Sequence, residues 1–174
     1  PAEKPIDFNS GVALFGSCFS ENIAKKIAYF QIPHFSNAHG ILFNPLAIEG
    51  AIADCAKKKK YTEDDLICRD GIWLSLNHHS RFSGTKKTEL LNEINRSVQA
   101  GNAFLKRCSH LINTLATAWI YTYQNKTPVA NCHKIPQREF EKTLLSVDEI
   151  TDSLARIILN MKDFNPGMEI IFTL

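Results

Sequence analysis

The stretch Val12 to Ile27, VALFGSCFSENIAKKI, decides the fold of this chain. Its first four residues, VALF, have no polar face, which is typical of a strand buried on both sides of a parallel sheet. Apolar residues then recur at helical spacing, at Ile23, Ile27 and Phe30. The junction of strand and helix therefore falls at residues 16–18, where open α/β sheets place ligands and catalytic groups.

The serine and cysteine at this junction allow two interpretations. Ser17 or Ser20 fits the capping position of the helix, and Cys18 fits a buried free thiol. The same geometry also serves catalysis, because the free NH groups and the positive dipole end of a helix stabilise an oxyanion. Both interpretations stay open from these residues alone.

Composition limits the class of protein. The 174 residues are enough for one domain, and 44% hydrophobic with 22% charged residues is ordinary for a globular protein. A net charge of +2 is too small to indicate nucleic-acid binding, and no apolar run is long enough to span a membrane. Five cysteines without paired spacing favour reduced thiols, so we expect a cytoplasmic protein with neither nucleic acid nor membrane as partner.

Further elements follow from local signals. Asn44 and Pro45 predict the start of a helix that runs to about Cys55, and Asp70-Gly71 predicts a hairpin. Apolar spacing predicts a helix over 88–105, and the run HLINTLATAWIYTY predicts a strand.

The last third of the chain carries its own signals. Residues 125–128 predict a turn into a second hairpin at VANCHK, and Ser146 with Glu149 forms a capping box for a helix over 147–161. The run MEIIFTL predicts a final strand. Together these elements predict an α/β fold, a three-layer α/β/α sandwich with a mostly parallel sheet and small hairpin insertions. Because the chain stops at Leu174 on the carboxyl end of a strand, we expect a single domain, 1–174, that lacks its carboxyl-terminal part.

Five motifs stand in the order and spacing of a known family: LFGSCFSENI, HGILFNPLAIE, NHHSRFSG, TLATAWIY and VANCHKIP. From about Ile6 to Leu174 the sequence resembles the GSCFA family, which belongs to the SGNH/GDSL hydrolase group. The resemblance implies a flavodoxin-like sheet, an esterase-type ancestry and no cofactor. In SGNH hydrolases a serine after the first strand attacks an ester carbonyl, backbone NH groups and an asparagine hold the oxyanion, and an Asp-x-x-His block supplies the base.

The resemblance assigns roles residue by residue. Gly16 matches the glycine of the first block, so an ungapped count places Cys18 at the nucleophile position, and a shift of one residue places Ser17 there. Gly40 matches the glycine of the second block. The third block has no clear asparagine and offers Thr117 instead, with Ala116 where the family usually has glycine. The Asp-x-x-His block is expected beyond the end of this chain.

Two histidine motifs add candidates. Neighbours on a strand point to opposite faces, so one of His78 and His79 is expected to face the pocket, and His79 is the candidate for substrate binding. His133 either orients substrate or pairs with an acidic group, or it is a hydrogen-bonded turn residue beside a core Cys132. The spacings CxxC, HxH and HExxH are missing, so no metal site is predicted.

Two functions follow as expectations. The first is an SGNH-type hydrolase whose substrate is a small-molecule or carbohydrate ester. The alternative is a non-catalytic glycan-binding or scaffold domain derived from the same fold, with a sugar docked near Trp119, Tyr121 and His79. The oligomeric state does not follow from the sequence.

Overall fold

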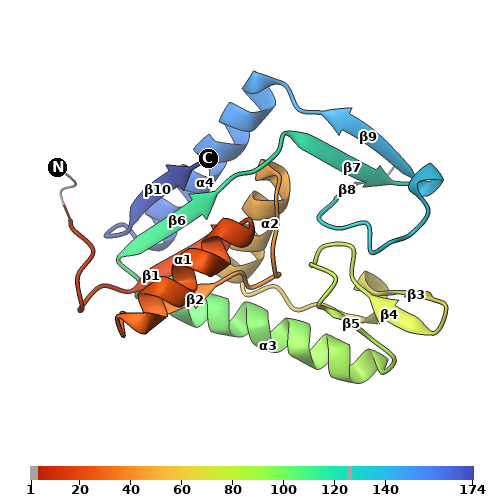
Figure 1. Cartoon of the computed structure of the whole chain (residues 1–174), viewed down its shortest axis with the longest axis horizontal. Coiled ribbons are helices and arrows are strands. Elements are labelled where there is room, and N and C mark those ends of the chain that lie inside the picture. The colour runs from red at the N-terminus through yellow and green to blue at the C-terminus, as the bar shows by residue number, and fades with distance from the viewer. Residues whose placement is uncertain (1–3, 125–126) are drawn as a thin grey trace.

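A four-stranded parallel sheet forms the centre of the computed structural model, which describes residues 4–124 and 127–174 (Figure 1). Its strands are β1 (Val12–Gly16), β2 (His34–Ser36), β6 (His110–Thr114) and β10 (Glu169–Thr173). Their spatial order is β10-β6-β1-β2, which is the flavodoxin-like order in which the direction of winding reverses between the first and third strands. The predicted α/β class is confirmed.

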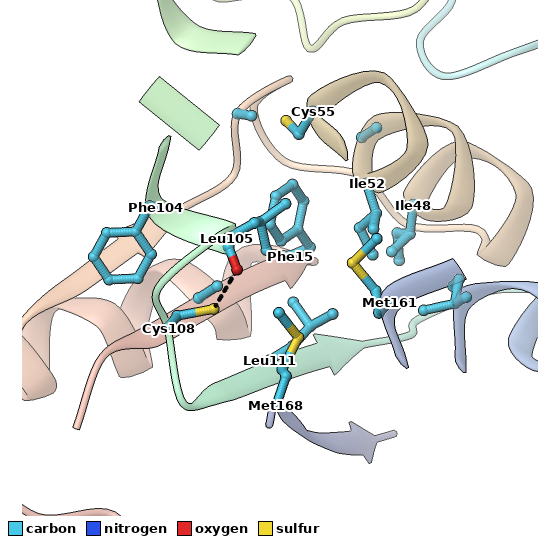
Figure 2. Close-up of a cluster of buried hydrophobic side chains, with 14 of the residues drawn as sticks. Phe15, Ile48, Ile52, Cys55, Phe104, Leu105, Cys108, Leu111, Met161 and Met168 are labelled. Carbon is cyan, nitrogen blue, oxygen red and sulfur yellow. Dashed lines mark hydrogen bonds between the residues drawn. The ribbon is translucent and has the colours of Figure 1, made fainter. Parts of the chain in front are cut away.

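Helices cover both faces of this sheet. The helix α1 (Cys18–Tyr29) packs on one face, and α2 (Pro45–Ala56), α3 (Lys87–Leu105) and α4 (Val147–Phe164) contribute to the core on the other (Figure 1). Alternation along β1 explains the three layers, since Val12 and Leu14 join the α1 core while Ala13 and Phe15 join the larger one. Figure 2 shows this larger core, where Phe15, Ile52 and Met161 lie among the labelled side chains.

Two small antiparallel sheets lie beyond the carboxyl ends of the parallel strands (Figure 1). One contains β3 (Ile67–Arg69), β4 (Ile72–Leu74) and β5 (Ser83–Gly84). The other contains β7 (Trp119–Tyr123), β8 (Pro128–Val129) and β9 (Phe140–Leu144). Two short 3₁₀ turns, Glu63–Asp65 and Gln137–Glu139, precede β3 and β9.

Local signals placed most element ends correctly. Asn44 caps α2 by accepting a hydrogen bond from the NH of Ala47 at 2.8 Å, and Ser146 with Glu149 forms the predicted capping box of α4. Asp70 and Gly71 have φ values of 50° and 77°, as the predicted two-residue hairpin requires.

The prediction of one strand over HLINTLATAWIYTY was wrong. The segment contains two strands in two different sheets, β6 and β7, with a break at 115–118. The break begins where Ala116 and Thr117 donate their NH groups to the carbonyl of Phe43 and no longer to a neighbouring strand. The strand β9 was not predicted, and part of the predicted turn at 125–128 lies outside the described residues. Among the described helices, none is both long and apolar enough to cross a membrane.

Candidate functional site

Gly16 ends β1 in a conformation that only glycine adopts easily. Its φ is +133°, and a Cβ at this position would lie 2.1 Å from the carbonyl oxygen of Thr114 on β6. This close approach lets the NH of Ser17 donate to the same oxygen at 3.2 Å. The loops that follow β1 and β6 are therefore joined at the point where the strand order reverses, which is where α/β sheets carry their ligand sites.

Ser17 and Cys18 differ in their surroundings. Ser17 is the N-cap of α1, is only 5% exposed, and its Oγ accepts a hydrogen bond from the NH of Phe19 at 3.4 Å. Cys18 is the first residue of the helix, and its thiol is exposed. The capping interpretation of Ser17 is confirmed, whereas the interpretation of Cys18 as a buried thiol was wrong. The helix start thus offers an accessible sulfur beside a largely enclosed hydroxyl.

The segment that follows β2 is hydrogen-bonded to the loop after β1 and to the loop after β6. Asn37 accepts a hydrogen bond from the NH of Gly16 through Oδ1 at 2.9 Å, and Leu42 donates its NH to the carbonyl of Gly16 at 3.0 Å. Gly40 lies in the turn between them with φ +79°, and its NH donates to the carbonyl of Asn37 at 2.8 Å. The segment that contains Gly40, the predicted second-block glycine, is therefore hydrogen-bonded to Gly16, which directly precedes the candidate nucleophiles. The NH of Gly40 itself already has a partner.

Thr117 approaches the same edge from β6. The NH groups of Ala116 and Thr117 donate to the carbonyl of Phe43 at 3.0 and 3.2 Å, which fixes this loop against the start of α2. Thr117 Oγ1 accepts a hydrogen bond from the NH of Trp119 at 3.1 Å, so the hydroxyl proton is free to be donated. The structure thus connects the loops of Ser17, Cys18, Gly40 and Thr117 through backbone hydrogen bonds.

His79 joins this site from the smaller β3-β4-β5 sheet. Its NH donates to the carbonyl of His39 at 2.8 Å, and a Cβ on Gly40 would lie 2.4 Å from the Cβ of His79. Burial and the charge of Arg81 lower the pKa of His79, and Glu21 on α1 opposes them. The imidazole is therefore neutral at pH 7.

His133 lies against a different loop. Its Nε2 is 2.8 Å from the carbonyl oxygen of Ser75 and 2.9 Å from that of His78, so the ring proton must be on Nε2. Burial lowers the pKa of His133, although both hydrogen bonds raise it. The ring also lines a groove of about 630 Å³ together with Arg69 and Lys134. Within residues 4–124 and 127–174, His133 makes no hydrogen bond to the loops that carry Ser17, Cys18, Gly40 or Thr117.

Three of the other cysteines are buried or half-buried, and burial raises the pKa values of their thiols. It raises the pKa of Cys55 to about 12, with Asp54 adding to the effect, and that of Cys108 to about 11. Burial also raises the pKa of the half-buried Cys132. Cys18 and Cys68 are the thiols that solvent reaches most freely. Among the described residues, no three His, Cys, Asp or Glu side chains are grouped as a metal site would need.

The structure also contains a buried polar cluster that sequence analysis missed. His39 stacks on His78 with ring centroids 4.2 Å apart, and its Nε2 lies 3.3 Å from Asp54 Oδ2 and 3.2 Å from the hydroxyl of Tyr61. His39 stands directly before Gly40 in a quoted motif, which was the one available signal. Asn113 on β6 was missed as well: it is fully buried, and its amide has no partner within the described chain.

Two cavities border the edge of the parallel sheet at Thr117. One has a volume of about 300 Å³ and is lined by the 115–118 loop, Pro45 and Ile150. The other, of about 210 Å³, has aromatic walls from Trp119 and Tyr121.

Comparison with known proteins identifies one family. The model of the GSCFA family matches residues 11–174, which is nearly the whole chain. A search of curated proteins and a search of solved structures each returned no match.

Proposed function

The chain belongs to the GSCFA family, and from this membership and the geometry above we propose that it is an SGNH-type hydrolase of acyl or carbohydrate esters. One observation carries the proposal: Gly16, Ser17 and Cys18 stand at the carboxyl end of β1 and the start of α1, at the reversal point of the sheet. In the proposed reaction the nucleophile adds to the ester carbonyl, the alcohol leaves, and water then hydrolyses the acyl intermediate.

The surroundings of the two candidates favour Cys18 as the nucleophile. Its thiol is exposed, whereas Ser17 is 5% exposed and already caps α1 through its Oγ. A reaction at Ser17 would have to proceed on an oxygen that also holds the helix start. The proposal therefore gives Cys18 the attacking role and Ser17 the role of capping and orienting the helix.

The oxyanion has two candidate donors besides the helix start. Within residues 4–124 and 127–174, Thr117 Oγ1 accepts a hydrogen bond from the NH of Trp119 and donates none, so its hydroxyl proton is available. Gly40 has to share its NH or release the turn, since that NH donates to Asn37. We therefore propose that the NH groups at the start of α1 and the hydroxyl of Thr117 bind the oxyanion. Gly40 and His79 are assigned to the wall of the substrate site.

Covalent labelling tests the proposal. The intact full-length protein is treated with an activated ester probe and a fluorophosphonate, and the modified peptides are identified by mass spectrometry. Cys18 should be labelled much faster than Cys68, which is also exposed but lies on the hairpin strand β3. Labelling and ester hydrolysis should disappear in Cys18→Ala and persist in Cys68→Ala. A folded protein in which neither Ser17 nor Cys18 reacts would exclude this hydrolase mechanism.

A second candidate function is glycan binding without turnover. The cavity of about 210 Å³ is lined by Trp119, Tyr121, Asn131 and Thr117, and aromatic faces beside amide groups suit the apolar face and the hydroxyls of a sugar ring. His79, which we also expected near the sugar, lies against Gly40 and is not among the residues that line this cavity.

A binding assay distinguishes the two candidates. Short oligosaccharides with and without acetyl esters are titrated against the full-length protein and its Trp119→Ala variant. Binding that depends on Trp119, without release of acetate, supports the binding domain. Acetate release that Cys18→Ala abolishes supports the hydrolase.

A further inference from the structure

Two cavities meet at Thr117, the residue whose hydroxyl we assign to the oxyanion. The larger cavity has a volume of about 300 Å³ and the smaller one of about 210 Å³. Among the described residues, Thr117 is the only one that lines both. An ester whose carbonyl oxygen is bound by Thr117 therefore has two different spaces beside it for its two parts.

The segment just before α2 connects both cavities to the loop of the proposed nucleophile. Leu42 donates its NH to the carbonyl of Gly16 at 3.0 Å, and the carbonyl of Phe43 accepts two NH groups from the loop after β6. The next two residues line the cavities, Asn44 the smaller and Pro45 the larger. Both cavities thus border the carboxyl edge of the sheet, where the reaction is proposed to take place.

The larger cavity has apolar walls. They consist of Pro45, Leu115, Ile150, Leu174 and two alanines, and the hydroxyl of Thr117 is the one polar side-chain group among the described lining residues. A charged or strongly polar ligand group would lose its water here without gaining partners, whereas an alkyl chain is stabilised by leaving water. At roughly 30 Å³ for each non-hydrogen atom, the volume holds about ten such atoms.

The smaller cavity has aromatic and amide walls. The rings of Trp119 and Tyr121 line it together with the side chains of Asn44 and Asn131. Asn44 Oδ1 already caps α2, and Asn131 Oδ1 accepts the NH of His133 at 2.8 Å. Within the described chain, the Nδ2 groups of both asparagines lack partners, so they are available to donate to hydroxyl groups. Aromatic rings beside amide donors suit one side of a sugar ring.

Building on the hydrolase function proposed above, we propose that the substrate is a medium-chain acyl ester of a sugar. The acyl chain lies in the larger cavity, the sugar contacts the smaller cavity, and the ester carbonyl lies at Thr117 between them. Acyl chains of up to about ten carbons fit the larger cavity, whereas an acetyl group leaves most of it empty. The acyl chain therefore selects the substrate through the apolar surface that it buries.

The first part of the test measures binding with probes that contain no ester. Methyl, butyl, hexyl and octyl β-glucosides are titrated against the full-length protein by calorimetry, at concentrations below micelle formation. Ala116→Leu fills the larger cavity from an exposed position, so the variant is expected to fold. The matched control is Ala100→Leu, an exposed position on α3 that lines neither cavity. Trp119→Ala removes a wall of the smaller cavity.

Affinity should rise by about two- to fourfold for each methylene that enters the larger cavity. Ala116→Leu should remove most of this rise, and Ala100→Leu should leave it unchanged. Trp119→Ala should weaken the binding of all four glucosides by a similar factor. An affinity that does not depend on chain length, or a rise that Ala116→Leu leaves unchanged, would overturn the assignment of the larger cavity.

The second part measures hydrolysis of glucose esters that carry acetyl, butanoyl, hexanoyl or octanoyl groups. The value of kcat/KM should rise with chain length in the wild type, and Ala116→Leu should shift the preference toward acetyl. Cleavage at the same rate for every chain length would overturn this substrate class and leave the hydrolase function intact. Chain-length-dependent glucoside binding without cleavage of any ester would refute the hydrolase function and support the two cavities as a site for an alkylated sugar.

Discussion

Replacing Gly16 with alanine should destabilise the protein more than most single substitutions do. The new Cβ would lie 2.1 Å from the carbonyl oxygen of Thr114 and 2.9 Å from both its carbonyl carbon and its nitrogen. These are backbone atoms of a paired strand, so no side-chain rotation relieves the overlap. The ends of β1 and β6 would have to move apart.

The size of the effect follows from two contributions. An L residue held at φ +133° costs about 1–3 kcal/mol in backbone strain. Separation of the strand ends also breaks the bond from the Ser17 NH to Thr114, which contributes about 1 kcal/mol. We expect the free energy of unfolding to fall by about 2–4 kcal/mol, against about 1 kcal/mol for an average substitution.

Urea unfolding, followed by the fluorescence of Trp73 and Trp119, measures this difference. The matched control is Gly50→Ala in α2, where a Cβ meets no atom within 4 Å and φ is ordinary for a helix. Because glycine in a helix costs about 0.5–1 kcal/mol relative to alanine, the control should gain stability by that amount.

The two variants together make the reasoning refutable. If Gly16→Ala unfolds within about 0.5 kcal/mol of the wild type, the close approach of β1 and β6 does not exist in solution. A loss of stability in Gly50→Ala as large as that in Gly16→Ala would show instead that the chain tolerates no added Cβ, whatever the local geometry.

Three further predictions rest on single features of the structure. Ser17→Ala removes the cap of α1 and should lower the free energy of unfolding by about 1 kcal/mol in a urea titration, whereas Ser17→Asn should retain stability. Burial lowers the pKa values of four histidines, His39, His78, His79 and His133, so the unfolded chain binds protons that the folded chain does not. Stability should fall by at least about 2 kcal/mol between pH 6.5 and 5.5, which is the contribution of His39 and His78 alone, and a flat pH profile would contradict this. Asn113→Leu removes a buried amide that has no hydrogen-bond partner among the described residues, so the free energy of unfolding should rise by about 1–3 kcal/mol and the melting temperature with it; a lower melting temperature would contradict this.

Helices and hairpins whose ends carry a local capping or turn signal could be predicted from the sequence. Asn44 before Pro45 and Ser146 before Glu149 act within one helical turn, so their signals need no knowledge of the rest of the fold. The hairpin at Asp70-Gly71 is equally local, since two residues with positive φ suffice to specify the turn.

The break between β6 and β7 could not be predicted in this way. The NH groups of Ala116 and Thr117 bond to Phe43, which is far from them in the sequence, so this partner is in place only when the sheet has formed. Residues with high strand propensity on both sides hide the break, because propensity does not tell which sheet a strand enters.

The buried cluster had even less signal in the sequence. His39, Asp54 and Tyr61 have no motif spacing, and a lone acidic residue on an amphipathic helix is ordinarily solvent-exposed. The ionised state of Asp54 depends on hydrogen bonds from His39 and Tyr61, which come from two other segments of the chain. Sequence patterns report periodicity, whereas this cluster depends on which helix face meets which loop.

The location of the candidate site could be predicted from the order of the strands, whereas the identity of the reacting atom could not. Any chain whose first strand ends at a glycine before a helix, in a sheet of this order, brings the loops after its first and third strands together. Which atom reacts there depends on a competition between capping and exposure that the sequence leaves open. In the structure, capping engages Ser17 Oγ and leaves the sulfur of Cys18 facing solvent at the positive end of α1. The same helix start that stabilises the fold through its serine therefore makes the next residue the better candidate for chemistry.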